Sequence, residues 1–250
     1  MGESTYLSHF WDDPSRDFRQ RYQVPEHFLW DPYDLKTVDY EGYVEIALGL
    51  LPKPPCLVLD VGCGDGWVAR KATKRGYTVT GVDYSERAIG FARLMVPEAQ
   101  FHVGDVRALA NNSDWKDRFE AALCIEVIEH IPVEYHVSVL LAIRYCLVAG
   151  GTLVLTVPSI YVPLNRWHYK HFTVEEGAQL LRQGGFEVQG IVNQHVLTPL
   201  SSPFLWRLLR NRFYDFRAAR VILKSVLSKR FSTTDNPRRA GRYIYQAVKV

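Results

Sequence analysis

The stretch L-V-L-D-V-G-C-G-D-G, from Leu57 to Gly66, decides the fold that this chain is expected to adopt. The apolar run from Cys56 to Val61 is typical of a strand buried on both faces, as in a parallel sheet. The alternate glycines Gly62, Gly64 and Gly66 predict a tight turn that lets a ligand approach the backbone, followed by a helix. No Lys-Ser/Thr pair follows the turn, which excludes the phosphate loop of ATPases, and the third glycine comes one residue too early for the dinucleotide fingerprint G-x-G-x-x-G.

Strands and helices alternate along the rest of the chain. This β-α-β rhythm predicts the α/β class, a doubly wound and mostly parallel seven-stranded sheet with helices on both faces. Ligands of such sheets bind outside the carboxyl ends of the strands, at the switch point beside strand one. The expected strands are 56–61, 77–82, 100–104, 120–125, 151–157, 186–192 and 242–250, and the expected helices are 40–51, 66–75, 85–95, 134–148 and 173–184.

The 250 residues are enough for one α/β domain with additions. We expect an N-terminal lid over residues 1–38, a cofactor-binding core over 39–193, a helical cap insertion over 194–241 and a last strand over 242–250. The lid is rich in aromatic residues and interrupted by prolines, so it either packs on the core or lines a substrate or cofactor pocket.

The net charge of +3 is unevenly distributed. From Phe204 onward twelve Lys and Arg face only two acidic residues, which leaves the first 203 residues with a net charge of −7. Within this basic segment, residues 204–230 have the pattern of an amphipathic helix. It predicts either a cap over the substrate site or a peripheral contact with a membrane surface or another polyanion.

Bulk features favour a cytoplasmic protein. No apolar run approaches the ~20 residues that span a bilayer, and the N-terminus lacks the basic-then-apolar form of a secretion signal. The four cysteines include no C-x-x-C pair, which favours buried, reduced thiols over disulfides or zinc ligands. No pattern in the sequence predicts an oligomeric state.

Acidic residues follow the first three core strands. Asp60 closes the first strand, Asp83 ends the second and Asp105 follows the third in H-V-G-D-V. An acid placed as Asp83 is can accept hydrogen bonds from both hydroxyls of a ribose, although it can also cap the helix that starts near Ser85. Together with the glycine turn, these residues predict a nucleoside-containing ligand.

The spacing D-x-G-x-G-x-G resembles the first motif of the class I S-adenosylmethionine-dependent methyltransferases, and the resemblance extends over about residues 44–186. It implies S-adenosylmethionine as the cofactor. It also implies that Asp105 contacts the adenine amino group with Val106 against the ring, and that Asp60 orders the turn. The cofactor-binding residues that it implies are Asp60, Gly62, Gly64, Asp83, Tyr84, Asp105, Val106 and Ile125.

The fourth strand runs into C-I-E-V-I-E-H-I-P, where Glu126, Glu129 and His130 share one face if the segment forms a helical turn. Two chemical readings follow from these residue types, beside a purely structural one. His130 could act as a general base toward a substrate hydroxyl, with Glu126 or Glu129 orienting its ring. Alternatively, the two carboxylates and the imidazole could hold a divalent cation.

The motif E-x-x-E-H is similar to that of small-RNA 3′-end 2′-O-methyltransferases, in which Glu, Glu, His and a later His ligate a metal. It also looks like the corresponding segment of quinone-biosynthesis O-methyltransferases. A second histidine comes from N-R-W-H-Y-K-H-F-T, with His168 as the candidate catalytic or substrate contact. No metal is expected in the first reading, whereas the second would use Glu126, Glu129, His130 and His171.

These observations predict a methyltransferase acting on oxygen of a small-molecule or lipid-linked acceptor in biosynthesis. A nucleic acid is not the expected partner, because the N/D-P-P-Y/F motif shared by DNA base methylators is absent. Two alternatives stay open. One is a metal-dependent RNA 2′-O-methyltransferase, and the other is a cofactor-binding scaffold without catalysis.

Overall fold

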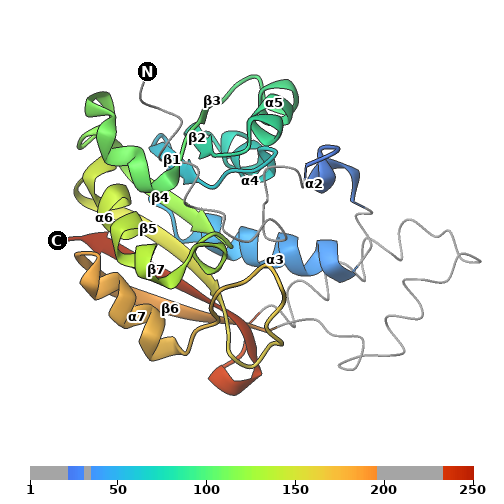
Figure 1. The fold of residues 1–250 in the computed structure, drawn as a ribbon, viewed down its shortest axis with the longest axis vertical. Helices are drawn as coiled ribbons and strands as arrows, with labels where there is room; N and C mark the ends of the chain where they lie inside the picture. The colour runs from blue at the N-terminus through green and yellow to red at the C-terminus, as the bar shows by residue number, and fades with distance from the viewer. Residues whose placement is uncertain (1–21, 31–34, 196–232) are drawn as a thin grey trace, which may run out of the picture.

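A computed structural model describes residues 22–30, 35–195 and 233–250 of the chain (Figure 1). Its centre is a seven-stranded sheet in the order β3-β2-β1-β4-β5-β7-β6. The predicted fold class, a doubly wound and mostly parallel sheet, is confirmed. The strands are β1 (Leu57–Val61), β2 (Thr78–Asp83), β3 (Gln100–Val103), β4 (Phe119–Ile125), β5 (Leu147–Pro158), β6 (Phe186–His195) and β7 (Ala240–Lys249).

The direction of the strands creates the site. β1 pairs in parallel with β2 on one side and with β4 on the other, while β7 runs antiparallel between β5 and β6. The strand order changes direction between β1 and β4, because the chain continues from β1 to β2 on one side and from β4 to β5 on the other. The connections after β1 and β4 therefore lead away from each other, which leaves a crevice at the carboxyl ends of these two strands. Asp60 and Ile125 lie near this crevice, at or beside the ends of these two strands.

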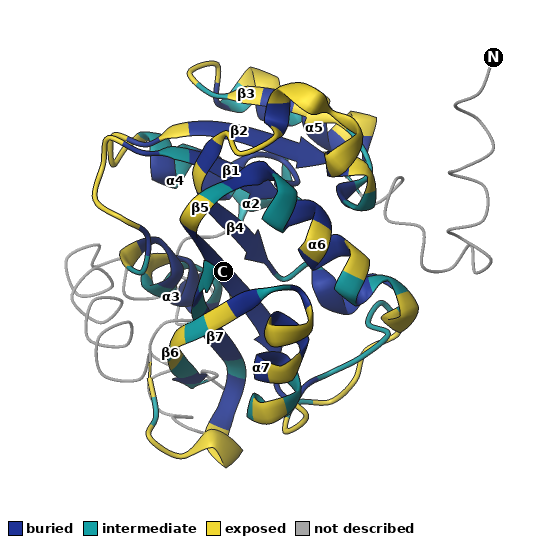
Figure 2. Cartoon of the chain, turned by 90° about the vertical axis from the view of Figure 1, so that its left-hand side faces the viewer, coloured by how far each residue is buried: buried dark blue, intermediate teal, exposed yellow. Residues whose placement is uncertain are grey.

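Helices cover both faces of the sheet, as Figure 2 shows for α3 and α4 on one side and α6 and α7 on the other. Two separate apolar cores result, one on each face. Along the sheet, residues such as Leu59 and Leu123 are fully buried, which explains the continuous apolar runs of the sequence. The longer helices are α3 (Leu35–Gly49), α4 (Trp67–Thr73), α5 (Glu86–Met95), α6 (His136–Cys146) and α7 (Val174–Gln183), and the short helix α2 is Glu26–Leu29.

Local sequence signals set several helix starts. Ser85 caps α5 by accepting from the Ala88 amide, so the capping role weighed for Asp83 belongs to Ser85. Thr173 and Glu176 form the reciprocal capping box of α7 that H-F-T-V-E-E predicts. The helix expected over residues 40–51 starts earlier in the structure, where α3 begins at Leu35.

The predicted lid and cap are only partly within the described residues. Of the lid, residues 22–30 and 35–38 are described, and the basic segment 204–230 lies outside the described residues altogether. Both strands that flank the predicted cap are longer than expected, because β6 continues to His195 and β7 begins at Ala240. An isolated antiparallel β-bridge pairs Gln194, near the end of β6, with Thr233, which precedes β7.

All four cysteines are free and buried, which confirms the prediction of buried reduced thiols. Among residues 22–30, 35–195 and 233–250, no helix combines the length and apolarity needed to cross a membrane.

Candidate functional site

The glycine turn leaves β1 in a backbone conformation that side chains oppose. Gly62, Gly64 and Gly66 have φ of +70°, +53° and +85°. The turn is fixed to the end of β2, because the Gly62 amide donates to the Val82 carbonyl at 2.8 Å and the Gly64 amide donates to Asp83 Oδ2 at 3.0 Å. A Cβ on Gly62 would lie 2.5 Å from Val127 Cγ2, so a side chain there would collide with the neighbouring loop.

Two buried carboxylates stand side by side at this turn. Burial raises the pKa of Asp83 to about 6, although backbone amides of Ser85 and Gly64 favour its charged form. Burial, with the charge of Asp83, raises the pKa of Asp60 to about 7. Asp60 Oδ2 has no hydrogen-bond partner among the described residues. A buried acceptor of this kind is expected where a ligand supplies the missing donor.

The other predicted cofactor residues line the same cavity, which has a volume of about 420 Å³. They are Tyr84, Asp105, Val106 and Ile125. Asp105 is already engaged, since the guanidinium of Arg107 donates to both of its oxygens at 2.6 to 3.1 Å. Its proposed contact with an adenine amino group would therefore share the carboxylate with Arg107.

Part of the N-terminal segment covers the glycine turn. The His27 amide donates to Asp65 Oδ2 at 3.0 Å, and His27 Nδ1 lies 2.9 Å from Asp65 Oδ1. The Tyr22 hydroxyl lies where a Cβ on Gly64 would point, 2.5 Å from that position. Tyr22, His27 and Trp30 all line the cavity.

Glu126 is held in a hydrogen-bond network on the floor of the cavity. Its backbone is strained, with φ of +53°, and its amide donates to Thr156 Oγ1 at 2.9 Å. Arg242 of β7 donates from Nε to Glu126 Oε2 at 2.8 Å and from Nη1 to Asp39 Oδ2 at 2.9 Å. Gln194 completes the network by donating to Asp39 Oδ1.

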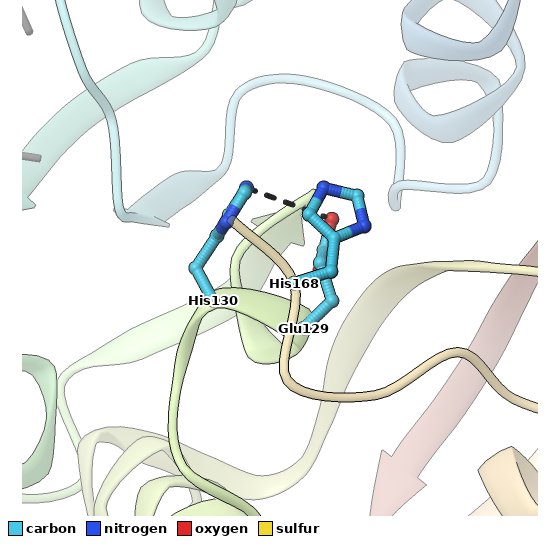
Figure 3. Close-up of side chains that lie close together, drawn as sticks. All are labelled: Glu129, His130 and His168. Carbon is cyan, nitrogen blue, oxygen red and sulfur yellow. Dashed lines mark ion pairs between the residues drawn. The ribbon is translucent and has the colours of Figure 1, made fainter. Parts of the chain in front are cut away.

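Glu129, His130 and His168 converge beside this floor (Figure 3). One potential ligand atom from each lies within 4.8 Å of the others, and His130 Nε2 is 4.0 Å from Glu129 Oε1. Within the part of the chain that the structure describes, this convergent group includes neither Glu126 nor His171. Glu129 is fully buried, and burial with the nearby charge of Glu126 raises its pKa well above the usual range.

Hydrogen bonds define the tautomers of the three histidines. His130 Nδ1 lies 2.9 Å from the Trp167 carbonyl, so this nitrogen carries the proton and Nε2 keeps the lone pair. His171 Nδ1 donates to the Val162 carbonyl in the same way, which makes its Nε2 the acceptor for His168 Nδ1 at 2.7 Å. Burial and the neighbouring imidazoles lower the pKa of His168 to about 3, so it is neutral at physiological pH.

Sequence reasoning missed Arg242, Asp39 and Gln194, which form the floor of the cavity with Glu126. The signal available was weak: a single charged residue at the start of an otherwise apolar last strand, R-Y-I-Y-Q-A-V. It also missed Asp65, whose carboxylate binds His27, because the motif treats this position as variable.

Replacing Asp60 with Asn should raise the free energy of unfolding, and more so at high pH than at low pH. Because the folded-state pKa of about 7 exceeds the unfolded value, folding retains a proton between about pH 4 and pH 7, and the stability contributed by Asp60 falls as pH rises through this window. We expect Asp60→Asn to unfold several degrees higher than the wild type at pH 8, with the difference shrinking toward pH 5. Thermal unfolding at both pH values measures this.

The exposed Asp114 provides the control, since Asp114→Asn should change the melting temperature little at either pH. An equal melting-temperature difference at pH 5 and pH 8 for Asp60→Asn would contradict the assignment.

Replacing Arg242 with Met should destabilise the fold. It leaves the carboxylates of Glu126 and Asp39 without their cation while they remain largely buried. We expect a loss of about 2 kcal/mol, below the range for a fully buried pair because all three side chains keep some solvent contact. Urea unfolding measures it.

Arg182→Met is the matched control, because Arg182 pairs with Glu175 on the exposed face of α7. That variant should lose less than about 0.5 kcal/mol. Equal losses for the two arginine variants would show that the floor network contributes no more than a surface pair.

Comparison with known proteins agrees with this geometry. Residues 58–151 match the family model described as a methyltransferase domain. The chain is 34% identical over 128 residues to a ubiquinone biosynthesis O-methyltransferase of Azoarcus sp. (strain BH72), a match covering 50% of this chain and 48% of that protein. The protein of the same name from Alkalilimnicola ehrlichii is 29% identical over 249 residues, covering 90% of this chain and 92% of that one.

The chain thus matches about half the length of the first of these relatives. A crystal structure of a SAM-dependent methyltransferase from Archaeoglobus fulgidus superposes with a TM-score of 0.60 at 18% identity, covering 86% of this chain and 95% of that one. The sequence matches, the structural superposition and the glycine turn agree with one another. The chain therefore resembles methyltransferases in sequence over residues 58–151 and shares the fold of a SAM-dependent methyltransferase.

Proposed function

We propose that this protein transfers a methyl group from S-adenosylmethionine to an oxygen atom of a small-molecule or lipid-linked acceptor. The relatives from Azoarcus and Alkalilimnicola, both named O-methyltransferases of ubiquinone biosynthesis, support oxygen as the acceptor atom. The observation that carries the proposal is that the glycine turn and the His130 cluster line one cavity.

The residues at the glycine turn fit the cofactor. Three glycines with positive φ leave the backbone open to a ligand, and the orphan oxygen of Asp60 provides a buried acceptor. The wall also carries Asp65, Asp83 and Asp105, and a negative wall attracts a cationic ligand. When bound, S-adenosylmethionine supplies an electrophilic methyl group on a positively charged sulfonium, which the residues of the cavity align with the acceptor.

His130 is the residue that we assign to acceptor activation. Its Nδ1–H is held by the Trp167 carbonyl, so the ring cannot turn its lone pair away without losing that bond. The remaining lone pair on Nε2 belongs to a residue that lines the cavity. A hydroxyl placed there can lose its proton as the methyl group arrives, which makes the oxygen a better nucleophile.

The acceptor that suits this cavity best is a planar aromatic alcohol. Tyr40 and Tyr43 of α3 form one wall in edge-to-face contact, with ring centroids 5.1 Å apart, and Trp30 packs on Tyr40 at 5.3 Å. All three aromatic residues line the cavity, and an aromatic lining favours a flat, apolar ligand. The named activity of the relatives, in ubiquinone biosynthesis, agrees with such an acceptor.

Calorimetry with S-adenosylmethionine, followed by an assay of S-adenosylhomocysteine release with a panel of phenols and catechols, tests the proposal. We expect saturable cofactor binding and release that depends on an aromatic hydroxyl. Absence of cofactor binding would leave only the scaffold alternative. Release with RNA but with none of the phenols would favour the ribose methyltransferase instead.

Replacing His130 with Ala should lower kcat by about 10²-fold or more, since general acid–base groups contribute about 10²–10⁴-fold. The dissociation constant for S-adenosylmethionine should stay within about threefold of the wild-type value, because His130 lies beside the acceptor rather than the glycine turn. Single-turnover methyl transfer and calorimetry measure the two quantities.

His102→Ala serves as the control, because His102 is an exposed histidine on β3, outside the cavity. A His130→Ala enzyme that retains wild-type kcat would remove His130 from the mechanism.

A further inference from the structure

We infer that Arg107 is a positioning residue that fixes the Asp105 carboxylate for a purine with an exocyclic amino group. The inference rests on the proposed function, because it concerns how the cofactor site recognises the base of S-adenosylmethionine. Among the described residues, Asp105 lines the cavity and Arg107 lies behind this lining. Arg107 therefore acts through Asp105, and it decides how strongly adenine is preferred over a purine that lacks the amino group.

Asp105 is held at the carboxyl end of β3, close to the residue expected to bind the ribose. The Gly104 amide donates to the Asp83 carbonyl at 3.0 Å, which ties this end of β3 to the end of β2. The Asp105 side chain then caps a 3₁₀ helix, Val106–Asn111, by accepting from the Arg107 amide at 2.9 Å. The backbone thus places one carboxylate at the cavity wall, next to the ribose position.

The Arg107 guanidinium leaves this carboxylate about one acceptor position. Nε donates to Oδ1 at 3.1 Å and to Oδ2 at 3.0 Å, and Nη2 donates to Oδ2 at 2.6 Å. With the Arg107 amide, three N–H groups of one residue occupy the two oxygens. A carboxylate offers about four lone-pair positions, so about one remains. The amino group of adenine is a donor that can take it, whereas a purine with hydrogen at the same carbon cannot.

The guanidinium is itself held in place. The Arg107 side chain is 14% exposed, and its Cζ lies over the Tyr135 ring, 4.7 Å from the centroid. A cation over an aromatic face is attracted by the ring, and more strongly where water is excluded. The planar fork of arginine also sets the direction of the carboxylate, which the point charge of lysine does not. Arg107 therefore fixes the orientation of Asp105 as well as balancing its charge.

The fixed carboxylate has two consequences for binding. In the wild-type protein Asp105 cannot turn away when the donor is missing, because Arg107 holds both of its oxygens. A base without the amino group then leaves a charged acceptor without its hydrogen bond, which lowers affinity. In Arg107→Met the carboxylate can rotate toward water. Adenine then loses its fixed partner, and the base without the amino group is no longer penalised.

Calorimetry with S-adenosylhomocysteine, and with its analogue in which hydrogen replaces the adenine amino group, tests the inference. The wild-type protein should bind the adenine compound at least about tenfold more tightly, the effect of one hydrogen bond to a charged group. In Arg107→Met we expect this ratio to fall below about threefold, mainly because the adenine compound binds more weakly. Arg107→Lys keeps the charge but not the fork, so its ratio should lie between these two.

Arg118→Met is the matched control, because Arg118 is an exposed arginine that also lies over an aromatic ring, that of Phe119, and does not line the cavity. It should keep the wild-type ratio. An unchanged ratio in Arg107→Met, or a wild-type protein that binds both compounds equally, would overturn the inference. Loss of both compounds in Arg107→Met with a wild-type ratio in Arg107→Lys would show a merely structural role and would also overturn it. Failure of the wild-type protein to bind either compound would instead overturn the proposed function.

Discussion

The hydrogen bonds from the glycine turn to the end of β2 are the constraint on which the site depends. The amides of Gly62 and Gly64 are held by the Val82 carbonyl and the Asp83 carboxylate, so the turn after β1 takes its shape from the neighbouring strand. Glycine adopts the positive φ values that result without the strain that a side chain would add. The same turn carries Asp65, whose carboxylate accepts a hydrogen bond from His27. This contact joins the N-terminal segment to the cavity.

A second constraint comes from the antiparallel last strand. β7 runs between β5 and β6 and brings Arg242 below the cavity, where its guanidinium lies over the Tyr43 ring at 4.3 Å. One cation thereby joins α3, the end of β4 and β6, and neutralises two carboxylates. Glu126 can retain its strained backbone conformation because several hydrogen bonds of this network hold it in place.

The two ends of the cavity carry different charged and polar groups. Acidic groups at the glycine turn, with raised pKa values for Asp60 and Asp83, disfavour their own charge until a cationic ligand arrives. The Glu129–His130–His168 cluster instead combines a buried carboxylate with neutral imidazole lone pairs. This division agrees with the proposed reaction, in which one part of the cavity would hold a positively charged donor and the other would remove a proton from the acceptor.

The sequence by itself determined the sheet, the turn and the acids at the ends of the first strands, because each of these follows from contacts close in the chain or from a fixed strand–turn–helix spacing. The pairing of Glu126 with Arg242 was decided only by the tertiary structure. Periodicity places Glu126, Glu129 and His130 on one helical face, but it carries no information about Arg242, 116 residues away, which binds Glu126. The choice of His168 rather than His171 beside His130 has the same origin, since it depends on how the loop before α7 folds back onto the end of β4.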